Sequence, residues 1–526
     1  MVIGVNARVD KETLKRNRRM ARIARPATEV GSVSAATEIG RGASRRVLIV
    51  DLNNFAAFPT MSIGILTSSL RRAGHRVDVL CPLAYDAPAF ERERCETRYD
   101  DIRRRMHLST SPALATVRDA AARAYAWKSE RPHPIVVAEV GKALARKPDV
   151  VLLSAYLMHY KSVVKIAALA KAARIPCLVG GPMFNLDDTA RDWEAIDGVT
   201  AVVGAEVDLP ISDLVESVCS DEDVMPYPGV TVGGIRRTAA PPLRRLESLP
   251  VPDYSDFAWD RYPIRIAPLM TGRGCQWDKC LFCSDVISAA ARTFRTRPLE
   301  SVLNEAEELS RRHGLHSFVF LDLKLNSWPD MMRGISEHLR SYVRGAEWVG
   351  TVHVDQRADN GLTARDLANA AQGGMRRISF GLESGSQRML DLMRKGSDVE
   401  RNSRFIRDAY DAGLSIRCSM FRGFPGETAE DMEATADFLT EHAQYLDRIR
   451  FSDFKLSTGT PIHAALLEKG AVAEELSADD ARKARRRYRD PHDRAYRKKV
   501  SEVLDIVHQI NRRHLRNSAR QFDGVM

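Results

Sequence analysis

Three of the eight cysteines stand together in the stretch "TGRGCQWDKCLFCSD", where Cys275, Cys280 and Cys283 have the spacing C-x4-C-x2-C. Gly272 and Gly274 precede them and let the backbone fold tightly around a bulky ligand. A zinc ion prefers four ligands, and the further candidates, Cys418 and His353, lie on other predicted strands. An iron–sulfur cluster held by only three thiolates leaves one iron open to a substrate or cofactor. The spacing therefore favours a reactive iron–sulfur site, with zinc as the alternative.

The elements around this loop predict a barrel. Six apolar strands alternate with amphipathic helices, and these strands are expected at residues 264–271, 317–323, 347–355, 375–383, 414–422 and 448–457. Six βα units with right-handed crossovers indicate a partial (β/α)6 barrel of the TIM type. The cysteine loop follows the first strand, and barrels of this kind build their active sites at the carboxyl ends of the strands.

A second α/β region precedes the barrel. Nearly continuous apolar strands are expected at residues 46–52, 76–83, 149–157, 175–182 and 198–206, separated by helices and by a charged helical insertion at about 84–133. This pattern predicts a doubly wound, Rossmann-like parallel sheet that binds its ligand at the carboxyl ends of its strands. The predicted organisation is a basic, disordered leader (1–45), this α/β domain (46–220), a linker (221–261), the barrel (262–461) and a basic helical C-terminal segment (462–526).

The cysteine loop and barrel together resemble the radical S-adenosylmethionine (radical SAM) superfamily. In that family three cysteines after the first strand of a partial barrel hold a [4Fe–4S] cluster, usually with the spacing C-x3-C-x2-C, so this chain has one extra residue. Phe282, just before the third cysteine, matches the family. The resemblance implies that the open iron binds S-adenosylmethionine, whose reductive cleavage gives a 5′-deoxyadenosyl radical that abstracts hydrogen.

The same resemblance implies cofactor contacts at later strand ends. Glu383 and Ser384 in "FGLESGS" would contact the ribose or amino acid part of S-adenosylmethionine, although Ser384 or Ser386 could equally cap the next helix. Gly423 in "MFRGFPGET" would lie near the adenine. Asp322 and Asn326 in "FLDLKLN" offer polar contacts. Arg357 in "VDQRAD" is either a cofactor contact or a solvated surface arginine.

The N-terminal sheet is similar to that of the cobalamin-binding group within this family. Gly180 and Gly181 in "VGGPMFN" match its GGP turn and would let the backbone approach the nucleotide tail of cobalamin, which Ser154 could hydrogen-bond. The D-x-H-x-x-G motif that supplies a cobalt-ligating histidine is absent, because "DLNNFAAF" occupies that turn. An empty or repurposed sheet is the alternative.

With both cofactors, the resemblance implies methylation of an unactivated carbon, with methylcobalamin as methyl donor and a second S-adenosylmethionine restoring it. No individual catalytic residue is assigned. Radical cyclisation, rearrangement or oxidation of a small-molecule or peptide substrate is the alternative chemistry. A cluster- or cobalamin-responsive binding protein is the alternative from another class. A methylthiotransferase ranks third, because Cys81, Cys95, Cys177 and Cys219 lack the spacing of its second cysteine trio.

Composition limits the remaining classes. The net charge of +10 gathers near the chain ends without aromatic interleaving or a nucleic-acid module, so nucleic acid is not an expected partner. The sequence contains no run of eighteen apolar residues, so we expect no membrane span. The other cysteines are scattered singly, which is not the pattern of a disulfide framework. We expect a cytoplasmic enzyme that takes electrons from a flavodoxin or ferredoxin.

Overall fold

The computed structural model describes most of the chain after residue 42. The described residues are 43–55, 57–87, 89, 94–109, 111–224, 227–236, 241–284, 294–356, 361–472, 483–486, 488 and 493–525. They belong to one compact unit, Ala43–Met526. The predicted disordered leader and the predicted cofactor contact Arg357 lie outside the described residues, apart from 43–45.

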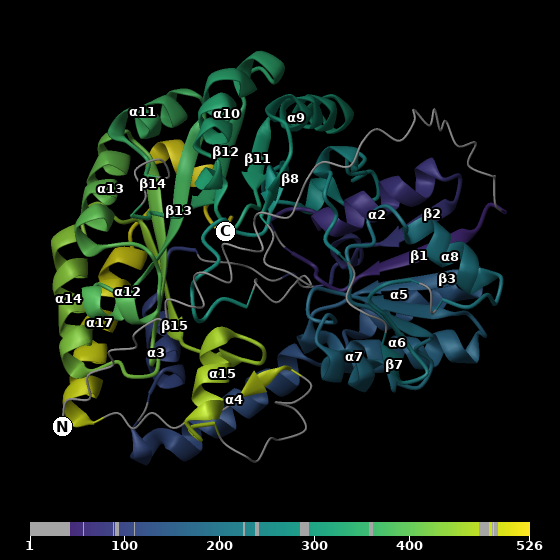
Figure 1. Cartoon of the computed structure of the whole chain (residues 1–526), viewed down its shortest axis with the longest axis horizontal. Coiled ribbons are helices and arrows are strands. Elements are labelled where there is room, and N and C mark those ends of the chain that lie inside the picture. Colours follow the sequence, from purple (N-terminus) through teal and green to yellow (C-terminus); the bar gives the residue numbers. More distant parts are fainter. Residues whose placement is uncertain are drawn as a thin grey trace, which may run out of the picture. The chain divides into compact units, whose positions relative to one another are not determined.

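The N-terminal half is built on a seven-stranded sheet (Figure 1). Its strands occur in the order β2-β1-β3-β4-β5-β6-β7, and the first five are parallel. In chain order they are β1 (Arg46–Asp51), β2 (Arg76–Leu80), β3 (Val150–Ser154), β4 (Cys177–Gly180), β5 (Ala201–Val203), β6 (Val230–Val232) and β7 (Ile235–Arg236). The order reverses between β1 and β3, so the crevice that binds ligands in such sheets opens at the ends of these strands.

The last two strands of this sheet fall inside the predicted linker. β6 pairs antiparallel with β5, and β7 pairs antiparallel with β6. Strands of three and two residues are too short to show alternation in the sequence, which is why the pattern predicted no regular structure there. The domain boundaries themselves stay predictions.

Helices cover the N-terminal sheet and bury its apolar strands. They are α2 (Met61–Arg72), α5 (Pro134–Ala145), α6 (Tyr160–Ala172), α7 (Asp187–Glu194) and α8 (Ile211–Cys219). The core side chains fall into two clusters, one containing Ile49 and Leu152 and the other containing Val50 and Val151. Neighbouring residues in a strand point to opposite faces, so both faces of the sheet are buried as predicted.

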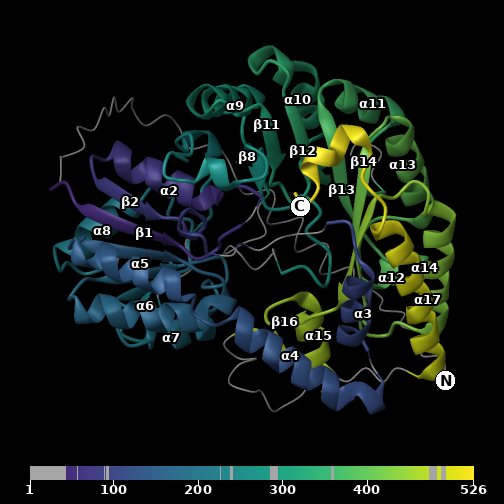
Figure 2. The ribbon, with the colours of Figure 1, turned by 180° about the vertical axis from the view of Figure 1, so that it is seen from behind.

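The second half is a six-stranded parallel sheet in sequential order, β15-β14-β13-β12-β11-β8. The strands are β8 (Ile266–Leu269), β11 (Ser317–Phe320), β12 (Glu347–Val352), β13 (Met375–Glu383), β14 (Ser415–Arg422) and β15 (Arg448–Asp453). Figures 1 and 2 show the intervening helices along the outer side of the strands. They are α9 (Leu299–His313), α10 (Pro329–Tyr342), α11 (Ala364–Gln372), α12 (Gln387–Leu392), α13 (Val399–Asp411) and α14 (Ala429–His442). This arrangement confirms the predicted partial (β/α)6 barrel.

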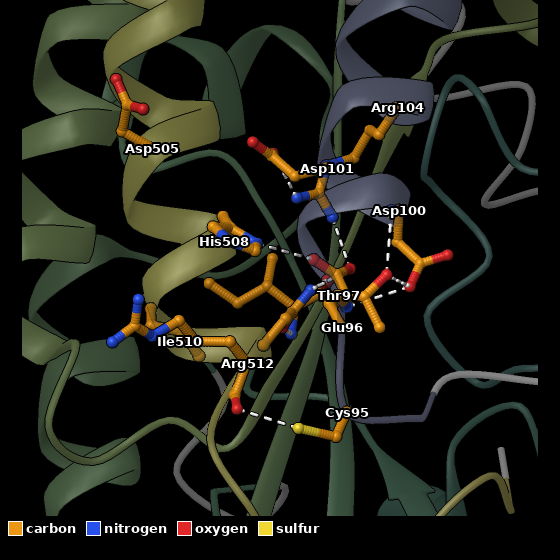
Figure 3. A network of polar contacts seen from close by, with 12 residues as sticks. Cys95, Glu96, Thr97, Asp100, Asp101, Arg104, Asp505, His508, Ile510 and Arg512 are labelled. Carbon is orange, nitrogen blue, oxygen red and sulfur yellow. Dashed lines mark hydrogen bonds and ion pairs between the residues drawn. The ribbon is translucent and has the colours of Figure 1, made fainter.

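The insertion of the N-terminal half is fixed to the C-terminal helix. The insertion carries α3 (Arg98–His107) and α4 (Ala115–Ser129), and the C-terminal segment carries α15 (Pro461–Glu468) and α17 (Arg494–Asn511). Glu96 accepts hydrogen bonds from Arg104 (2.5 Å) and from the Asn511 amide (2.8 Å). Arg105 pairs with Asp505 at 2.7 Å. Figure 3 shows the part of this network around Glu96, with the segment before α3 lying beside α17.

The same helix covers the free edge of the barrel sheet. The Asn511 side chain accepts from the Ile449 N–H (2.7 Å) and donates to the Ile449 carbonyl (2.8 Å), so it satisfies backbone groups of the edge strand β15.

In the parts of the chain that the structure describes, none of the helices combines the length and the apolar character that a membrane span needs.

Candidate functional site

The cysteine loop begins at the carboxyl end of β8, where the barrel fold predicts an active site. A short strand, β9 (Gly272–Arg273), pairs with β10 (Arg295–Thr296) and leads into the loop. Gly274 has a φ of +81°, in the left-handed region that favours glycine. Cys280 is buried, whereas Cys275 and Cys283 are half-buried.

Asp322 holds the start of this loop. Its carboxylate accepts hydrogen bonds from the Thr271 hydroxyl (2.6 Å) and from the N–H groups of Thr271 and Gly272 (3.0 and 2.9 Å). Burial raises its pKa to about 6, although these hydrogen bonds oppose the shift. The sequence predicted Asp322 as a cofactor contact, and its observed partners support a role in positioning the loop.

The extra residue between the first two cysteines is accommodated by Trp277. Its indole N–H donates to the Arg394 carbonyl (3.0 Å), and its ring stacks on His353 with 6.3 Å between centroids. Gly396 lies under the ring, because a Cβ there would come within 2.0 Å of the indole. The widened loop is therefore packed against the turn after α12.

A buried ion pair lies beside the cysteines. Lys395 Nζ lies 3.0 Å from Glu383 Oε1, and both side chains are more than nine-tenths buried. Burial raises the pKa of the Cys280 thiol, and the positive charge of Lys395 opposes that shift. Gly381 leaves room for the pair, since a Cβ there would lie 2.2 Å from the Glu383 carboxylate. Lys395 thus supplies positive charge where thiolates would coordinate iron.

A second buried ion pair forms the next layer. Lys324 and Asp355 pair with both side chains fully buried, and they follow β11 and β12. Asn326 joins the same strand ends by donating to the His353 carbonyl (2.9 Å) and accepting from its N–H (2.9 Å). His353 Nε2 lies 3.0 Å from the Lys395 carbonyl oxygen, which connects the two layers. Burial, reinforced by Lys395, lowers the pKa of His353 to about 4.

The remaining predicted contacts shape turns at the same barrel end. Ser384 bonds to the Thr435 hydroxyl (3.2 Å), and Ser386 caps α12 by accepting from the Met389 N–H (3.4 Å), so the capping alternative is present. Gly423 has a φ of +77° and donates its N–H to Glu427 (2.5 Å). Phe282 packs edge-on against Phe421 at 5.0 Å between centroids.

Sequence reasoning missed Lys324, Asp355 and Lys395. Lysines and aspartates after strands read as solvated turn residues, and only the fold brings them into buried pairs. The two other candidate zinc ligands do not join the cysteine loop as ligands. Cys418 packs in the hydrophobic core on the side of the outer helices, and His353 Nε2 is hydrogen-bonded to the Lys395 carbonyl. Among the described residues no three His, Cys, Asp or Glu side chains converge as ligands of one metal ion. In a [4Fe–4S] cluster each cysteine binds a different iron. The three thiols of such a site therefore lie farther apart than three ligands of one metal ion do.

The N-terminal half contains a cavity of about 410 Å³ at the carboxyl ends of its strands. Its floor is apolar, with Ile49, Leu152 and Leu178 from the strands, while Asn53, Thr60 and Ser154 supply polar groups at the strand ends. Ser154, Gly180 and Gly181, the three residues predicted for this site, all line it. An apolar cavity with few polar groups is typical of sites for large organic cofactors.

The close backbone packing beside this cavity requires glycine at position 181. A Cβ at that position would lie 2.1 Å from the Ala155 carbonyl oxygen, whereas at Gly180 the nearest atom would be 3.8 Å away. His159 follows β3, and its Nδ1 accepts the Tyr156 N–H at 3.1 Å and thereby stabilises its own turn. It is a structural histidine in this fold.

Arg273 connects the cavity with the cysteine loop. It lines the cavity, stands two positions before Cys275, and forms a bidentate pair with Asp208 (2.7 and 2.9 Å). Arg295, on the strand that pairs with β9, binds Glu206 in the same bidentate way (2.7 and 2.8 Å). Two charge-assisted pairs therefore connect the β9–β10 hairpin of the barrel half to the segment that follows β5 in the N-terminal sheet.

Comparison with known proteins agrees with this architecture. Residues 269–439 match the family model of the radical SAM superfamily. The "Uncharacterized methyltransferase PH0819" of Pyrococcus horikoshii is 28% identical over 62% of this chain and 70% of its own length. The anaerobic magnesium-protoporphyrin IX monomethyl ester cyclase of Rubrivivax gelatinosus is 25% identical, and the match covers 56% of this chain and 54% of the cyclase.

A solved structure shares this fold over most of the chain. The radical S-adenosylmethionine methyltransferase TsrM from Kitasatospora setae, with cobalamin and a [4Fe–4S] cluster bound, aligns with a TM-score of 0.61 at 16% identity. The alignment covers 88% of this chain and 91% of TsrM. The predicted fold class, a doubly wound sheet followed by a partial barrel, is thus confirmed.

Proposed function

We propose that the chain is a cobalamin-dependent radical SAM methyltransferase acting on an unactivated carbon, on the basis of the match of residues 269–439 to the radical SAM family model. The observation that carries this proposal is the continuity between two sites. Arg273 lines the cavity of the N-terminal sheet and also begins the cysteine loop, so a ligand of each site would face the same cleft.

Cys275, Cys280 and Cys283 would hold the [4Fe–4S] cluster. When bound, the cluster supplies the electron that cleaves S-adenosylmethionine, and methylcobalamin supplies the methyl group. Lys395 offsets the negative charge of the thiolates, and Trp277 covers one side of the loop. Glu383, Gly423 and Phe282 are our proposed contacts to S-adenosylmethionine.

The cavity lined by Ser154, Gly180 and Gly181 would hold cobalamin. The turn after β1 carries Asn53 and Asn54 where a cobalt-ligating histidine stands in other cobalamin proteins, so we propose that this protein provides no histidine ligand. Asn53 donates to the Ser154 hydroxyl at 3.3 Å, which orders the polar rim of the cavity.

The chain's own contribution is positioning. Bidentate Arg273–Asp208 and Arg295–Glu206 pairs fix the orientation of sheet and barrel, and the buried pairs Lys395–Glu383 and Lys324–Asp355 fix the strand ends. A rigid cleft that holds reacting atoms in line removes much of the entropic cost of reaction. We propose a flavodoxin or ferredoxin as reductant and the cytoplasm as location.

A radical cyclisation is the second candidate. It is supported by the similarity to a magnesium-protoporphyrin IX monomethyl ester cyclase, although the match covers about half of that enzyme.

The test is anaerobic purification, cluster reconstitution and incubation with S-adenosylmethionine and a reductant. The proposal expects corrin absorption bands and formation of both 5′-deoxyadenosine and S-adenosylhomocysteine. 5′-Deoxyadenosine without corrin or S-adenosylhomocysteine would favour cyclisation or another radical reaction. A protein that binds cofactors and yields neither product would be a binding protein, and the proposal would be wrong.

A further inference from the structure

The turn after β14 contains two glycines, whose backbone is conformationally free. Gly423 and Gly426 both have a positive φ, +77° and +89°. The parallel ladder between β14 and β15 ends at Arg422, so Gly423 is the first residue beyond the ladder, and it is buried. Buried backbone groups that leave a ladder need other hydrogen-bond partners. The conformation of this turn therefore depends on the side chains that bind Gly423.

Side chains bind both backbone groups of Gly423. Its N–H donates to Glu427 Oε2 at 2.5 Å, and its carbonyl accepts a hydrogen bond from the hydroxyl of Tyr488. The same Glu427 oxygen accepts from the hydroxyl of Tyr496 at 2.5 Å. Glu427 and Tyr496 are only 6% and 2% exposed, so little water competes for these bonds. A chain of hydrogen bonds thus connects Tyr496 through Glu427 to the turn.

The two tyrosines come from the C-terminal segment. Tyr496 lies in the first turn of α17, which packs beside α14 (Figure 2). Tyr488 pairs with Val472 in an isolated β-bridge. Both tyrosines lie beyond residues 269–439, the part of the chain that matches the family model. The matched domain therefore ends before the hydroxyl groups that hold this turn.

The turn is also connected to the cysteine loop. Phe424, inside the turn, is fully buried and belongs to an apolar cluster that includes Leu281 and Phe282. Leu281 follows Cys280, and its carbonyl accepts from the Ile462 N–H at 3.0 Å. A turn that moved would therefore lose packing beside the predicted cluster ligands.

The charge of Glu427 affects how firmly the turn is held. Burial raises the pKa of Glu427 to about 7, although the hydrogen bond from Tyr496 opposes the shift. Asp431 of α14 raises this pKa further, and Arg422 at the end of β14 lowers it. Arg388 of α12 is another nearby cation and is paired with Asp431. Uptake of a proton would neutralise the acceptor, and hydrogen bonds to a neutral acceptor are weaker.

We propose that Glu427 and Tyr496 are positioning residues for S-adenosylmethionine, because they hold the Gly423 turn in the conformation that receives the cofactor. This inference rests on the proposed function, in which Gly423 contacts S-adenosylmethionine. It gives the C-terminal segment a part in the cofactor site, since α17 supplies the hydroxyl that fixes Glu427. A turn that is already ordered loses less conformational entropy when a ligand binds.

The test measures the dissociation constant of S-adenosylmethionine on the reconstituted full chain by equilibrium dialysis, without reductant so that no cleavage occurs. Tyr496→Phe keeps the ring and removes the hydroxyl. We expect it to weaken binding about tenfold, as loss of one hydrogen bond to a charged group does. Tyr227→Phe is the matched control, because the Tyr227 hydroxyl bonds to Ser217 at 3.1 Å in the N-terminal half. It should leave binding unchanged.

A second variant separates positioning from a general loss of stability. Glu427→Gln retains an oxygen that can accept both hydrogen bonds, but it cannot titrate. Wild-type binding should weaken as the pH falls through about 7, and Glu427→Gln should lack this part of the pH dependence. The amino group of S-adenosylmethionine titrates equally with every variant, so the difference between the two profiles reports on Glu427. A purely structural role would leave the two profiles parallel.

The outcomes separate this inference from the proposed function. The inference is wrong if Tyr496→Phe binds as the wild type does, if Tyr227→Phe loses as much affinity, or if Glu427→Gln keeps the wild-type pH profile. Formation of 5′-deoxyadenosine by the wild type, once reductant is added, would then leave the proposed function standing. Tenfold weaker binding in Tyr496→Phe, together with no 5′-deoxyadenosine from the wild type, would contradict the proposed function alone. Wild-type protein that binds no S-adenosylmethionine would contradict both.

Discussion

The two halves of this molecule prepare for their ligands in opposite ways. The N-terminal sheet leaves an apolar cavity whose shape depends on glycine and on close backbone packing. The barrel end instead holds two buried ion pairs, Lys395–Glu383 and Lys324–Asp355, beside or below a loop of three thiols. A cavity of the first kind tolerates small polar changes and fails when its volume changes, whereas a charged site fails when one partner is removed.

The largest expected effect is loss of the cluster. Cys280→Ala should remove both iron binding and cleavage of S-adenosylmethionine, because two thiolates cannot retain a cluster built on three. Iron content and 5′-deoxyadenosine formation are the measurements. Cys219→Ala is the control, since Cys219 lies at the end of α8 and contacts the Asp149 carbonyl at 3.7 Å. A Cys280→Ala protein with normal iron content would contradict the cluster assignment.

Next comes the charge network of the barrel. Lys395→Met should destabilise the protein by about 3–5 kcal/mol, because Glu383 would remain buried without its partner. Chemical denaturation measures this loss. The double variant Lys395→Met with Glu383→Leu should recover much of the stability, since it removes both charges. Equal stability of the single and double variants would show that the pair is not coupled.

Much of this architecture could be predicted from the sequence, because alternation of apolar strands and helices reports burial directly. The six barrel strands follow from that pattern, while β6 and β7 were missed because strands of three and two residues carry no period. The cysteines were found by their spacing. Lys395 was missed, since a lysine in "MRKG" has the same local sequence whether it is solvated or buried against Glu383.

Residue roles were harder to predict than residue positions. Ser154, Gly180 and Gly181 line the N-terminal cavity. Asp322 stands at the predicted strand end, but its carboxylate accepts three hydrogen bonds from Thr271 and Gly272. Which groups a carboxylate meets depends on contacts between strands far apart in the chain, and no local pattern records them.

A smaller effect is expected in the N-terminal cavity. Gly181→Ala should weaken cobalamin retention about tenfold, equivalent to about 1.4 kcal/mol, because its Cβ collides with the Ala155 carbonyl. Gly180→Ala is the matched variant, whose Cβ has only an ordinary contact at 3.8 Å. Corrin absorbance after gel filtration measures retention. Equal losses in the two variants would show that the cavity does not depend on the close backbone approach at Gly181.

The last effect concerns His159 and vanishes at neutral pH, because it develops only as the pH falls below about 6.5. Burial lowers the pKa of His159 to about 4, below the ordinary value of about 6.5 that it has in the unfolded chain. The unfolded state therefore takes up a proton first as the pH falls, and the folded state loses up to about 1.4 kcal/mol per pH unit between about pH 6.5 and 4. His159→Gln, which can still accept the Tyr156 N–H, should flatten this part of the stability profile measured by urea unfolding. His133→Gln is the control, because His133 precedes α5 outside the cavity lining, and it should leave the slope in place. An unchanged slope in His159→Gln would mean that His159 takes up its proton at the same pH in the folded and unfolded protein. The N-terminal half would then contain a solvated histidine where the structure shows a buried one.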